Sequence, residues 1–186
     1  MIDVNDLRKG VTFELDGQIF KVLEYSHNKP GRGNATIRTK LYNLRSGANI
    51  ERTFQSGDRV QDIRLDHHQV QFLYKDGELY YFMDNENYEQ TRLTADQVGE
   101  ARLYLTENMN VEVLFFNQQP VAVEVPLFVE LEVAQTEPGV KGDTAAGGTK
   151  PATLESGVTI QVPLFINEGD RVKVDTRTGS YIERVK

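Results

Sequence analysis

Residues 29–34 read Lys-Pro-Gly-Arg-Gly-Asn, a short segment suited to presenting one cation. Pro30 holds φ at about −65° and lacks a backbone donor, while Gly31 and Gly33 accept positive φ at little steric cost. The pattern predicts a tight turn with the Arg32 side chain pointing outward. A guanidinium carries several donors in a rigid fork and stays charged at physiological pH. Such a tip suits contact with phosphate or RNA better than proton transfer.

The residues around this turn are basic. No acidic residue occurs between Tyr25 and Ile50, a stretch that contains Lys29, Arg32, Arg38, Lys40 and Arg45. Along a strand expected over 35–44, side-chain alternation separates a core face from a solvent face, namely Ile37, Thr39 and Leu41 from Arg38, Lys40 and Tyr42. We therefore expect a protruding basic arm that contacts RNA or phosphate. A solvated hairpin with an ordinary turn is the alternative interpretation.

The chain lacks the residue groupings expected of an enzyme. His67 and His68 are adjacent, so on a strand they face opposite sides and are not expected to share a metal ion. The segment 147–150 ends in Gly-Thr-Lys, unlike a P-loop, and Pro151 follows it. No Gly-x-Ser-x-Gly elbow occurs. We predict no catalytic residue, no cofactor and no metal site.

A long loop is expected at 137–153, rich in glycine and threonine and containing Lys141 and Lys150. Loops of this length in compact domains are commonly functional or disordered. Its glycine amides are suited to meeting phosphates or bases. A flexible linker is the alternative.

The elements that position these segments are mostly strands, which predicts an all-β fold of small barrels or sandwiches. Asp16-Gly17 and Asp76-Gly77 are hairpin signals, and residues 117–120 are a further expected turn. Thr94 and Gln97 have capping-box spacing and predict a short helix that extends to Tyr104.

Two short sequences recur and help to divide the chain. Ser-Gly-Asp-Arg-Val at 56–60 is echoed by Glu-Gly-Asp-Arg-Val at 168–172, as a turn feeding a strand. Val-Pro-Leu-Phe at 125–128 and 162–165 is expected to mark two strands with proline at a start or edge. We predict three modules, 1–64, 65–127 and 128–186.

Charge is distributed unevenly over these modules. The net charge of −7 divides into +3, −8 and −2 for residues 1–64, 65–127 and 128–186. Such asymmetry favours an oriented partner, although an acidic middle also serves solubility. The absence of cysteine, of a signal-like N-terminus and of a long apolar run predicts a cytoplasmic protein with no membrane partner.

Six segments together resemble the bacterial elongation factor P family. They are 29–33, 38–44, 51–57, 138–144, 147–157 and 174–181, of which the Pro-Gly-Val-Lys-Gly-Asp-Thr and Gly-Gly-Thr-Lys-Pro-Ala-Thr-Leu-Glu-Ser-Gly stretches are the most specific. The resemblance covers the whole chain. It implies a KOW/SH3-like barrel at 1–64, then an acidic OB-fold at 65–127 and a second OB-fold at 128–186, arranged in an L shape.

The resemblance also implies a function. A family member binds the 70S ribosome, both rRNA and ribosomal proteins, between the peptidyl and exit sites. There it stabilises peptidyl-tRNA and promotes peptide-bond formation at poor donors such as consecutive prolines. It acts as a monomer, without nucleotide hydrolysis. An RNA-binding β-barrel protein outside translation elongation is the alternative, and a protein-interaction role remains compatible with ribosome docking.

The implied contact residues fall in three groups. The acceptor end of peptidyl-tRNA meets Lys29, Pro30, Gly31, Arg32, Gly33 and Asn34. The basic arm adds Arg38 and Lys40. The exit-site codon loop, which faces mRNA, comprises Gly142, Asp143, Thr144, Gly147, Gly148 and Thr149. Many relatives carry a modified lysine at the tip and others an arginine bearing rhamnose. The Pro-Gly-Arg-Gly order here favours a bare Arg32.

Overall fold

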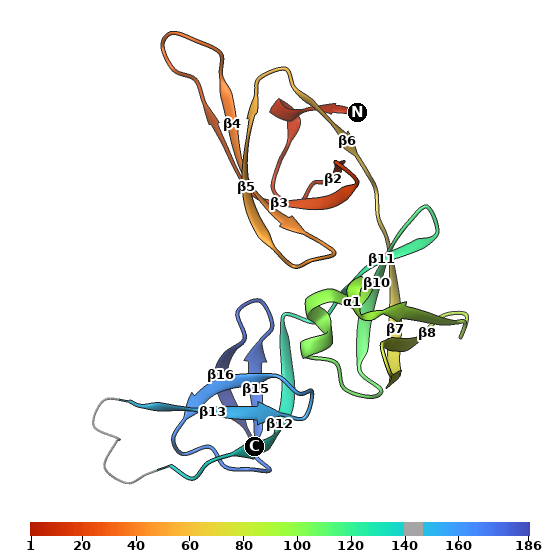
Figure 1. Cartoon of the computed structure of the whole chain (residues 1–186), viewed down its shortest axis with the longest axis vertical. Coiled ribbons are helices and arrows are strands. Elements are labelled where there is room, and N and C mark those ends of the chain that lie inside the picture. Colours follow the sequence, from red (N-terminus) through yellow and green to blue (C-terminus); the bar gives the residue numbers. More distant parts are fainter. Residues whose placement is uncertain (140–146) are drawn as a thin grey trace.

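A computed structural model describes residues 1–139 and 147–186 and consists mainly of three antiparallel sheets. Each sheet is built from a continuous part of the chain, and no strand of one sheet pairs with a strand of another among the described residues. The sheets curve around separate cores, and together they form the bent, L-like outline seen in Figure 1. The all-β prediction is confirmed.

The N-terminal sheet has the order β1-β6-β2-β3-β4-β5. Its strands are β1 (Ile2–Asp3), β2 (Thr12–Leu15), β3 (Gln18–Asn28), β4 (Thr36–Asn43), β5 (Asn49–Gln55) and β6 (Arg59–Asp62), with a 3₁₀ turn, η1 (Val4–Asp6). Alternating apolar side chains fill its core, among them the fully buried Phe13, Ile37 and Leu41. The predicted hairpin at Asp16-Gly17 joins β2 to β3, with φ of 53° and 75° at its two residues.

The middle sheet has the order β11-β10-β7-β8-β9. It consists of β7 (Asp66–Asp76), β8 (Leu79–Asp84), β9 (Gln90–Thr94), β10 (Asn110–Phe116) and β11 (Gln119–Glu124), with α1 (Ala95–Val98) and η2 (Gly99–Leu103) between β9 and β10. The predicted capping box is present, because Thr94 accepts from the Gln97 amide and the Gln97 side chain accepts from the Thr94 amide. The predicted helix is shorter than expected: α1 ends at Val98, and the 3₁₀ turn η2 continues to Leu103 with Tyr104 as its C-cap.

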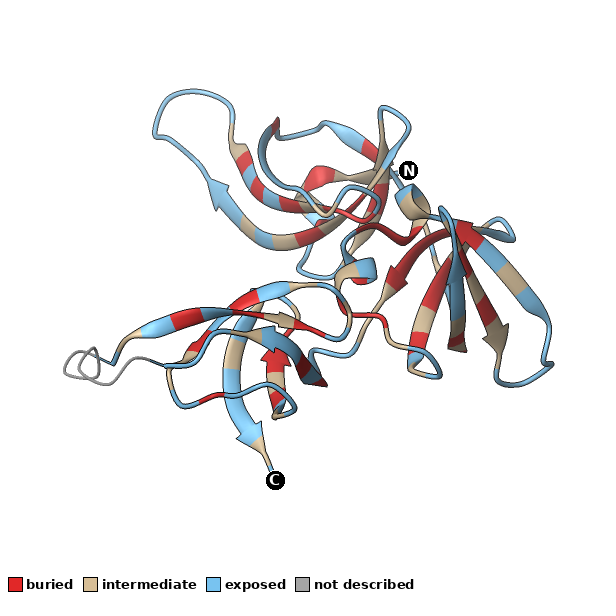
Figure 2. Cartoon of the chain, turned by 60° about the horizontal axis from the view of Figure 1, so that its bottom comes forward, coloured by how far each residue is buried: buried red, intermediate tan, exposed pale blue. Residues whose placement is uncertain are grey.

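The C-terminal sheet has the order β14-β13-β12-β15-β16. Its strands are β12 (Phe128–Thr136), β13 (Thr149–Leu154), β14 (Thr159–Pro163), β15 (Arg171–Asp175) and β16 (Ser180–Val185). Buried residues alternate with exposed ones along its strands (Figure 2). The repeated Gly-Asp turns are confirmed as equivalent: Asp58 accepts from the Gln55 amide and Asp170 from the Asn167 amide, both at 2.9 Å.

One turn prediction and one strand prediction need correction. The turn expected over 117–120 contains only Asn117 and Gln118, both with positive φ, because Gln119 and Pro120 already pair with β10. The two Val-Pro-Leu-Phe segments are not equivalent strands. Pro163 ends the edge strand β14, whereas Pro126 lies in the connection before β12, where it needs no ladder hydrogen bond.

Side chains from neighbouring sheets pack at both junctions. Leu44 of the N-terminal part is buried with Leu114, Val121 and Ala122 of the middle part. Tyr104, which follows η2, is buried in the core of the C-terminal sheet. These contacts connect the three cores in sequence order. No helix in the described parts of the chain is long and apolar enough to cross a membrane.

Candidate nucleic-acid interface

The predicted arm is the hairpin of β3 and β4, which projects from the N-terminal sheet (Figure 1). Its pairing runs to the outermost pair, Asn28 and Thr36. Val22 pairs with Leu41 and Glu24 with Lys40, so one extra residue forms a bulge in β3. Bulges increase the local twist and bend of a strand. The bulge therefore bends β3 between the inner and outer parts of the hairpin.

The outer hairpin is supported on its second side by β5. Pairing of β4 with β5 begins at Thr36 and Gln55 and continues to Tyr42 and Asn49. Thr39 is fully buried, and its hydroxyl donates to the Arg52 carbonyl oxygen at 2.8 Å. Three strands therefore hold the base of the tip, and residues 29–35 extend beyond them.

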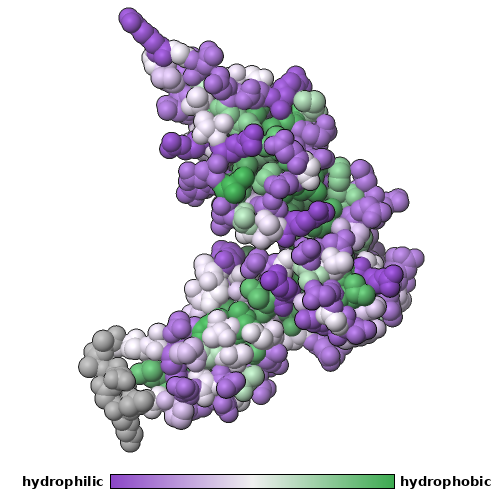
Figure 3. Space-filling model, in the orientation of Figure 1, coloured by the Kyte–Doolittle hydropathy of each residue, from purple (hydrophilic) through white to green (hydrophobic). Residues whose placement is uncertain are grey.

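The tip is exposed to solvent over residues 29–34, and it stands out as a hydrophilic projection in Figure 3. Gly33 has a φ of 124°, which an L side chain rarely adopts, whereas Gly31 does not use positive φ. A Cβ at either position would meet no atom within 4 Å. Within the described residues, Arg32 has no ion pair or hydrogen bond to a protein side chain. The guanidinium is thus available to an external anion.

The alternation predicted for β4 is confirmed for Ile37, Thr39 and Leu41, which are buried, and for the exposed Arg38 and Lys40. Tyr42, expected on the solvent face, is half-buried and packs against the cluster that contains Leu44 and Leu114. The arm carries less unpaired positive charge than its sequence predicts. Lys40 lies in register between Glu24 and Glu51, and its Nζ is 3.2 Å from a Glu24 carboxylate oxygen. Arg38 lies between Ser26 and Thr53 instead. Acidic residues just outside the acid-free stretch therefore neutralise part of the arm.

The second predicted contact segment joins β12 to β13. Gly142, Asp143 and Thr144 lie outside the described residues. Gly147 and Thr149 are exposed and Gly148 is half-buried, and the Thr149 hydroxyl donates to the Gln161 side chain at 3.1 Å.

Lys150 does not serve this segment as a free cation. It is buried, and its ammonium donates to the Glu137 carbonyl oxygen. Since a buried ammonium needs hydrogen-bond acceptors, this contact ties the start of β13 to the end of β12.

The titratable groups with shifted pKa lie away from the arm tip. A hydrogen bond from the Glu86 backbone amide is the main cause that lowers the pKa of Asp84, and a hydrogen bond with the His68 side chain lowers it further. Hydrogen bonds from Arg177 lower the pKa of Asp175. His67 and His68 are neighbours on β7 and contact different partners, Glu112 and Asp84, as expected of residues on opposite faces of a strand. The arm therefore offers charge and position at its tip.

Comparison with known proteins gives one consistent family. Family models match the "Elongation factor P (EF-P) KOW-like domain" at 3–60, the "Elongation factor P (EF-P) OB domain" at 65–123, and "Elongation factor P, C-terminal" at 129–184. These matches confirm the predicted KOW-like and OB assignments for the first two sheets. A solved eukaryotic translation initiation factor 5A from Methanococcus jannaschii shares the fold, with a TM-score of 0.51 and 22% identity over 67% of this chain and 90% of that chain.

Curated relatives match over the full length. Elongation factor P of Caldanaerobacter subterraneus subsp. tengcongensis is 57% identical over 185 residues, and that of Pelotomaculum thermopropionicum is 53% identical over 185 residues, with 100% of each chain covered. Elongation factor P of Thermoanaerobacter sp. is 55% identical over the same length. The chain belongs to the elongation factor P family of translation elongation factors.

Proposed function

We propose that this protein binds the bacterial ribosome between the peptidyl and exit sites and steadies the acceptor end of peptidyl-tRNA with residues 29–34. This promotes peptide-bond formation when the donor is poor, as at consecutive prolines. The protein works as a cytoplasmic monomer of three domains, 1–64, 65–127 and 128–186, without catalytic residues of its own. The observation that supports it most is Arg32, solvent-exposed at the end of a three-stranded support.

The physical basis is positioning. A constrained proline donor reacts slowly, and a mobile tRNA end spends little time in reactive geometry. Holding reactants in place removes several kcal/mol from a barrier, about 7–11 kcal/mol in the best-oriented cases. A guanidinium on a supported loop contributes charge and a fixed location, and it needs no proton transfer. The residues 142–144 and 147–149 are proposed to approach the exit-site codon.

The test is translation of a consecutive-proline reporter in a reconstituted system. Arg32→Ala is expected to lose most of the stimulation, and Arg32→Lys to retain part of it, since lysine keeps the charge but lacks the fork. Arg92→Ala is the matched control, because Arg92 is an exposed arginine on the middle sheet. Stimulation by Arg32→Ala equal to that of the native protein would refute the proposal.

Binding to free RNA separates this function from a general RNA-binding role. Lys40 is already paired with Glu24, so at most about four cations of the arm are available for phosphates. Each phosphate contact contributes about −0.7 to the slope of log affinity against log salt concentration. For bare tRNA this slope is therefore no steeper than about −3. Tight, steeply salt-dependent binding to bare tRNA, equal to binding to ribosomes, would favour the general role.

A further inference from the structure

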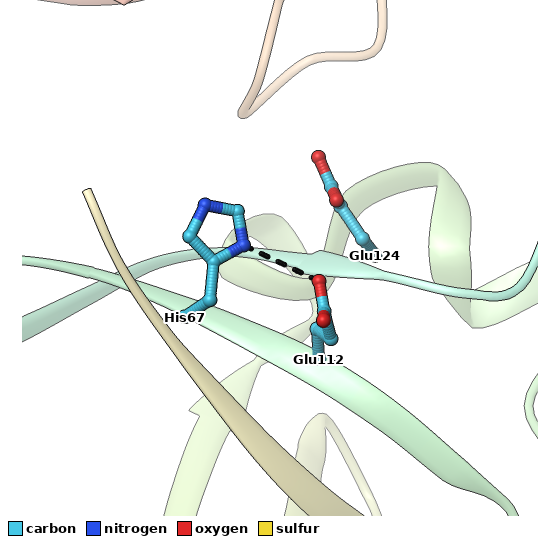
Figure 4. Close-up of side chains that lie close together, drawn as sticks. All are labelled: His67, Glu112 and Glu124. Carbon is cyan, nitrogen blue, oxygen red and sulfur yellow. Dashed lines mark hydrogen bonds and ion pairs between the residues drawn. The ribbon is translucent and has the colours of Figure 1, made fainter. Parts of the chain in front are cut away.

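Three side chains with metal-ligating atoms gather on the middle sheet, on the face that meets the N-terminal sheet. Glu112 of β10 lies directly opposite Glu124 of β11, and His67 of β7 lies opposite Leu114, two residues further along β10. Because residues two apart share a face, His67, Glu112 and Glu124 point to one side. Their ligand atoms all lie within 4.8 Å of one another. Figure 4 shows the three side chains lying close together.

The two glutamates place like charges opposite each other on neighbouring strands. Like charges directly opposite each other on neighbouring strands destabilise a sheet. Glu112 contacts His67 Nδ1 at 3.3 Å and also accepts a hydrogen bond from Gln69. Within residues 1–139 and 147–186, neither glutamate has an ion pair with a lysine or arginine. A cation between the carboxylates would relieve this repulsion.

We propose that His67, Glu112 and Glu124 bind a divalent first-row transition metal ion such as Zn²⁺. One imidazole and two carboxylates are accepted zinc ligands, and three protein ligands leave a position for water. Imidazole favours zinc, nickel or copper over Mg²⁺ and Ca²⁺. With metal–ligand bonds of about 2.1 Å, tetrahedral donors lie about 3.4 Å apart. The ligand atoms of the three side chains therefore need to approach one another by at most about 1.4 Å to bind the ion.

The surroundings give this site a structural consequence. His67 and Glu124 line a hollow of about 630 Å³ between the N-terminal and middle sheets. Leu44, which packs against Leu114 where these two sheets meet, lines it too. Lys21 and Arg64 line the same hollow and neither is paired with these glutamates among the described residues. A metal ion would connect β7, β10 and β11 beside the contact between the two sheets. It would thereby stabilise the middle sheet at this edge of the hollow, away from the arm.

The test is titration of the chelator-treated full chain with Zn²⁺ by calorimetry. The native protein is expected to bind one equivalent, with Mg²⁺ in excess unable to displace it. Glu124→Gln and His67→Ala are each expected to weaken binding at least tenfold. His68→Ala is the matched control, since His68 is also exposed but faces Asp84. Its affinity is expected to equal that of the native chain.

A second measurement keeps folding separate from binding. Zn²⁺ is expected to raise the thermal midpoint of the native protein and of His68→Ala, but not that of Glu124→Gln, because only a bound ligand stabilises the folded state. Without metal, Glu124→Gln is expected to be at least as stable as the native chain, as the substitution removes one of two repelling charges. Failure to bind one equivalent, or equal weakening by His68→Ala, would overturn the proposal. Arg32→Ala is expected to bind Zn²⁺ normally, so the result is independent of the proposed function.

Discussion

The carbonyl oxygen of Arg45 lies 2.7 Å from the position that a Cβ atom would occupy at Gly99. Arg45 belongs to the turn after β4, and Gly99 follows α1, so this contact joins the N-terminal and middle sheets. Gly99 has a φ of 64°, which also disfavours a side chain. On the other side of the contact, a Cβ at Gly47 would collide with the Glu100 side chain. The junction therefore places Gly99 at a close approach to backbone and Gly47 at a close approach to a side chain.

We expect Gly99→Ala to lower the free energy of unfolding and to loosen this junction. Gly77→Ala is the control, because Gly77 has a similar φ of 59° but no atom within 4 Å of its Cβ position. The steric contact is expected to make Gly99→Ala more destabilising than the control by about 1–3 kcal/mol. Urea unfolding measures the difference. Equal destabilisation by both substitutions would show that the contact contributes nothing.

Tyr104 is expected to hold the middle and C-terminal sheets together. Its side chain is 6% exposed and packs in the C-terminal core, and the Ser156 hydroxyl donates to the neighbouring Leu103 carbonyl oxygen at 2.7 Å. Tyr104→Ala is expected to cost about 3–5 kcal/mol of unfolding free energy through the cavity it leaves. Tyr104→Phe keeps the ring and serves as the control, with a much smaller loss. Equal stability of the two variants in chemical denaturation would contradict this role.

The Asp175–Arg177 pair is expected to make stability depend on acid pH. Arg177 donates to Asp175 through its backbone amide and side chain, and these hydrogen bonds hold the pKa of the carboxyl below its ordinary 3.8. A lowered native pKa stabilises the folded state fully above the unfolded-state value, and this stabilisation is lost as pH falls through the native value.

Carboxyl titration by NMR checks this pair. Arg177→Ala is expected to raise the pKa of Asp175 toward its ordinary range, because the donor side chain is lost. Arg92→Ala, on a different sheet, is expected to leave the pKa of Asp175 unchanged. An unaltered titration curve for Asp175 in Arg177→Ala would mean that the pair does not hold the carboxylate.

The capping box is expected to fix the start of α1. The Thr94 hydroxyl accepts from the Gln97 amide at 3.3 Å, and Gln97 Oε1 accepts from the Thr94 amide at 2.9 Å. Thr94→Ala is expected to lower the free energy of unfolding by about 1 kcal/mol, whereas Thr94→Ser retains the hydroxyl and most of the stability. Denaturant titration compares them. Loss of stability in both variants alike would assign the effect to packing of the Thr94 methyl group.

Much of the architecture follows from short-range rules that can be read directly from the sequence. Asp-Gly turns, alternation along β4 and the Thr94–Gln97 spacing depend on backbone preferences within a few residues. The turn at Asn117 and Gln118 is shorter than the sequence predicts. Its two residues adopt positive φ without glycine, so the sequence carries no Asp-Gly or Asn-Gly pair to mark its length.

The sequence by itself determined the strand pattern, the basic turn at 29–34 and the family to which the chain belongs. Only the tertiary structure decided which charges meet. Lys40 is paired with Glu24 because the bulge in β3 sets the register. His67, Glu112 and Glu124 converge because β7, distant in the chain, pairs with β10 of the β10–β11 hairpin. The physical reason is that strand register depends on burying one face of a whole sheet, which no local segment specifies.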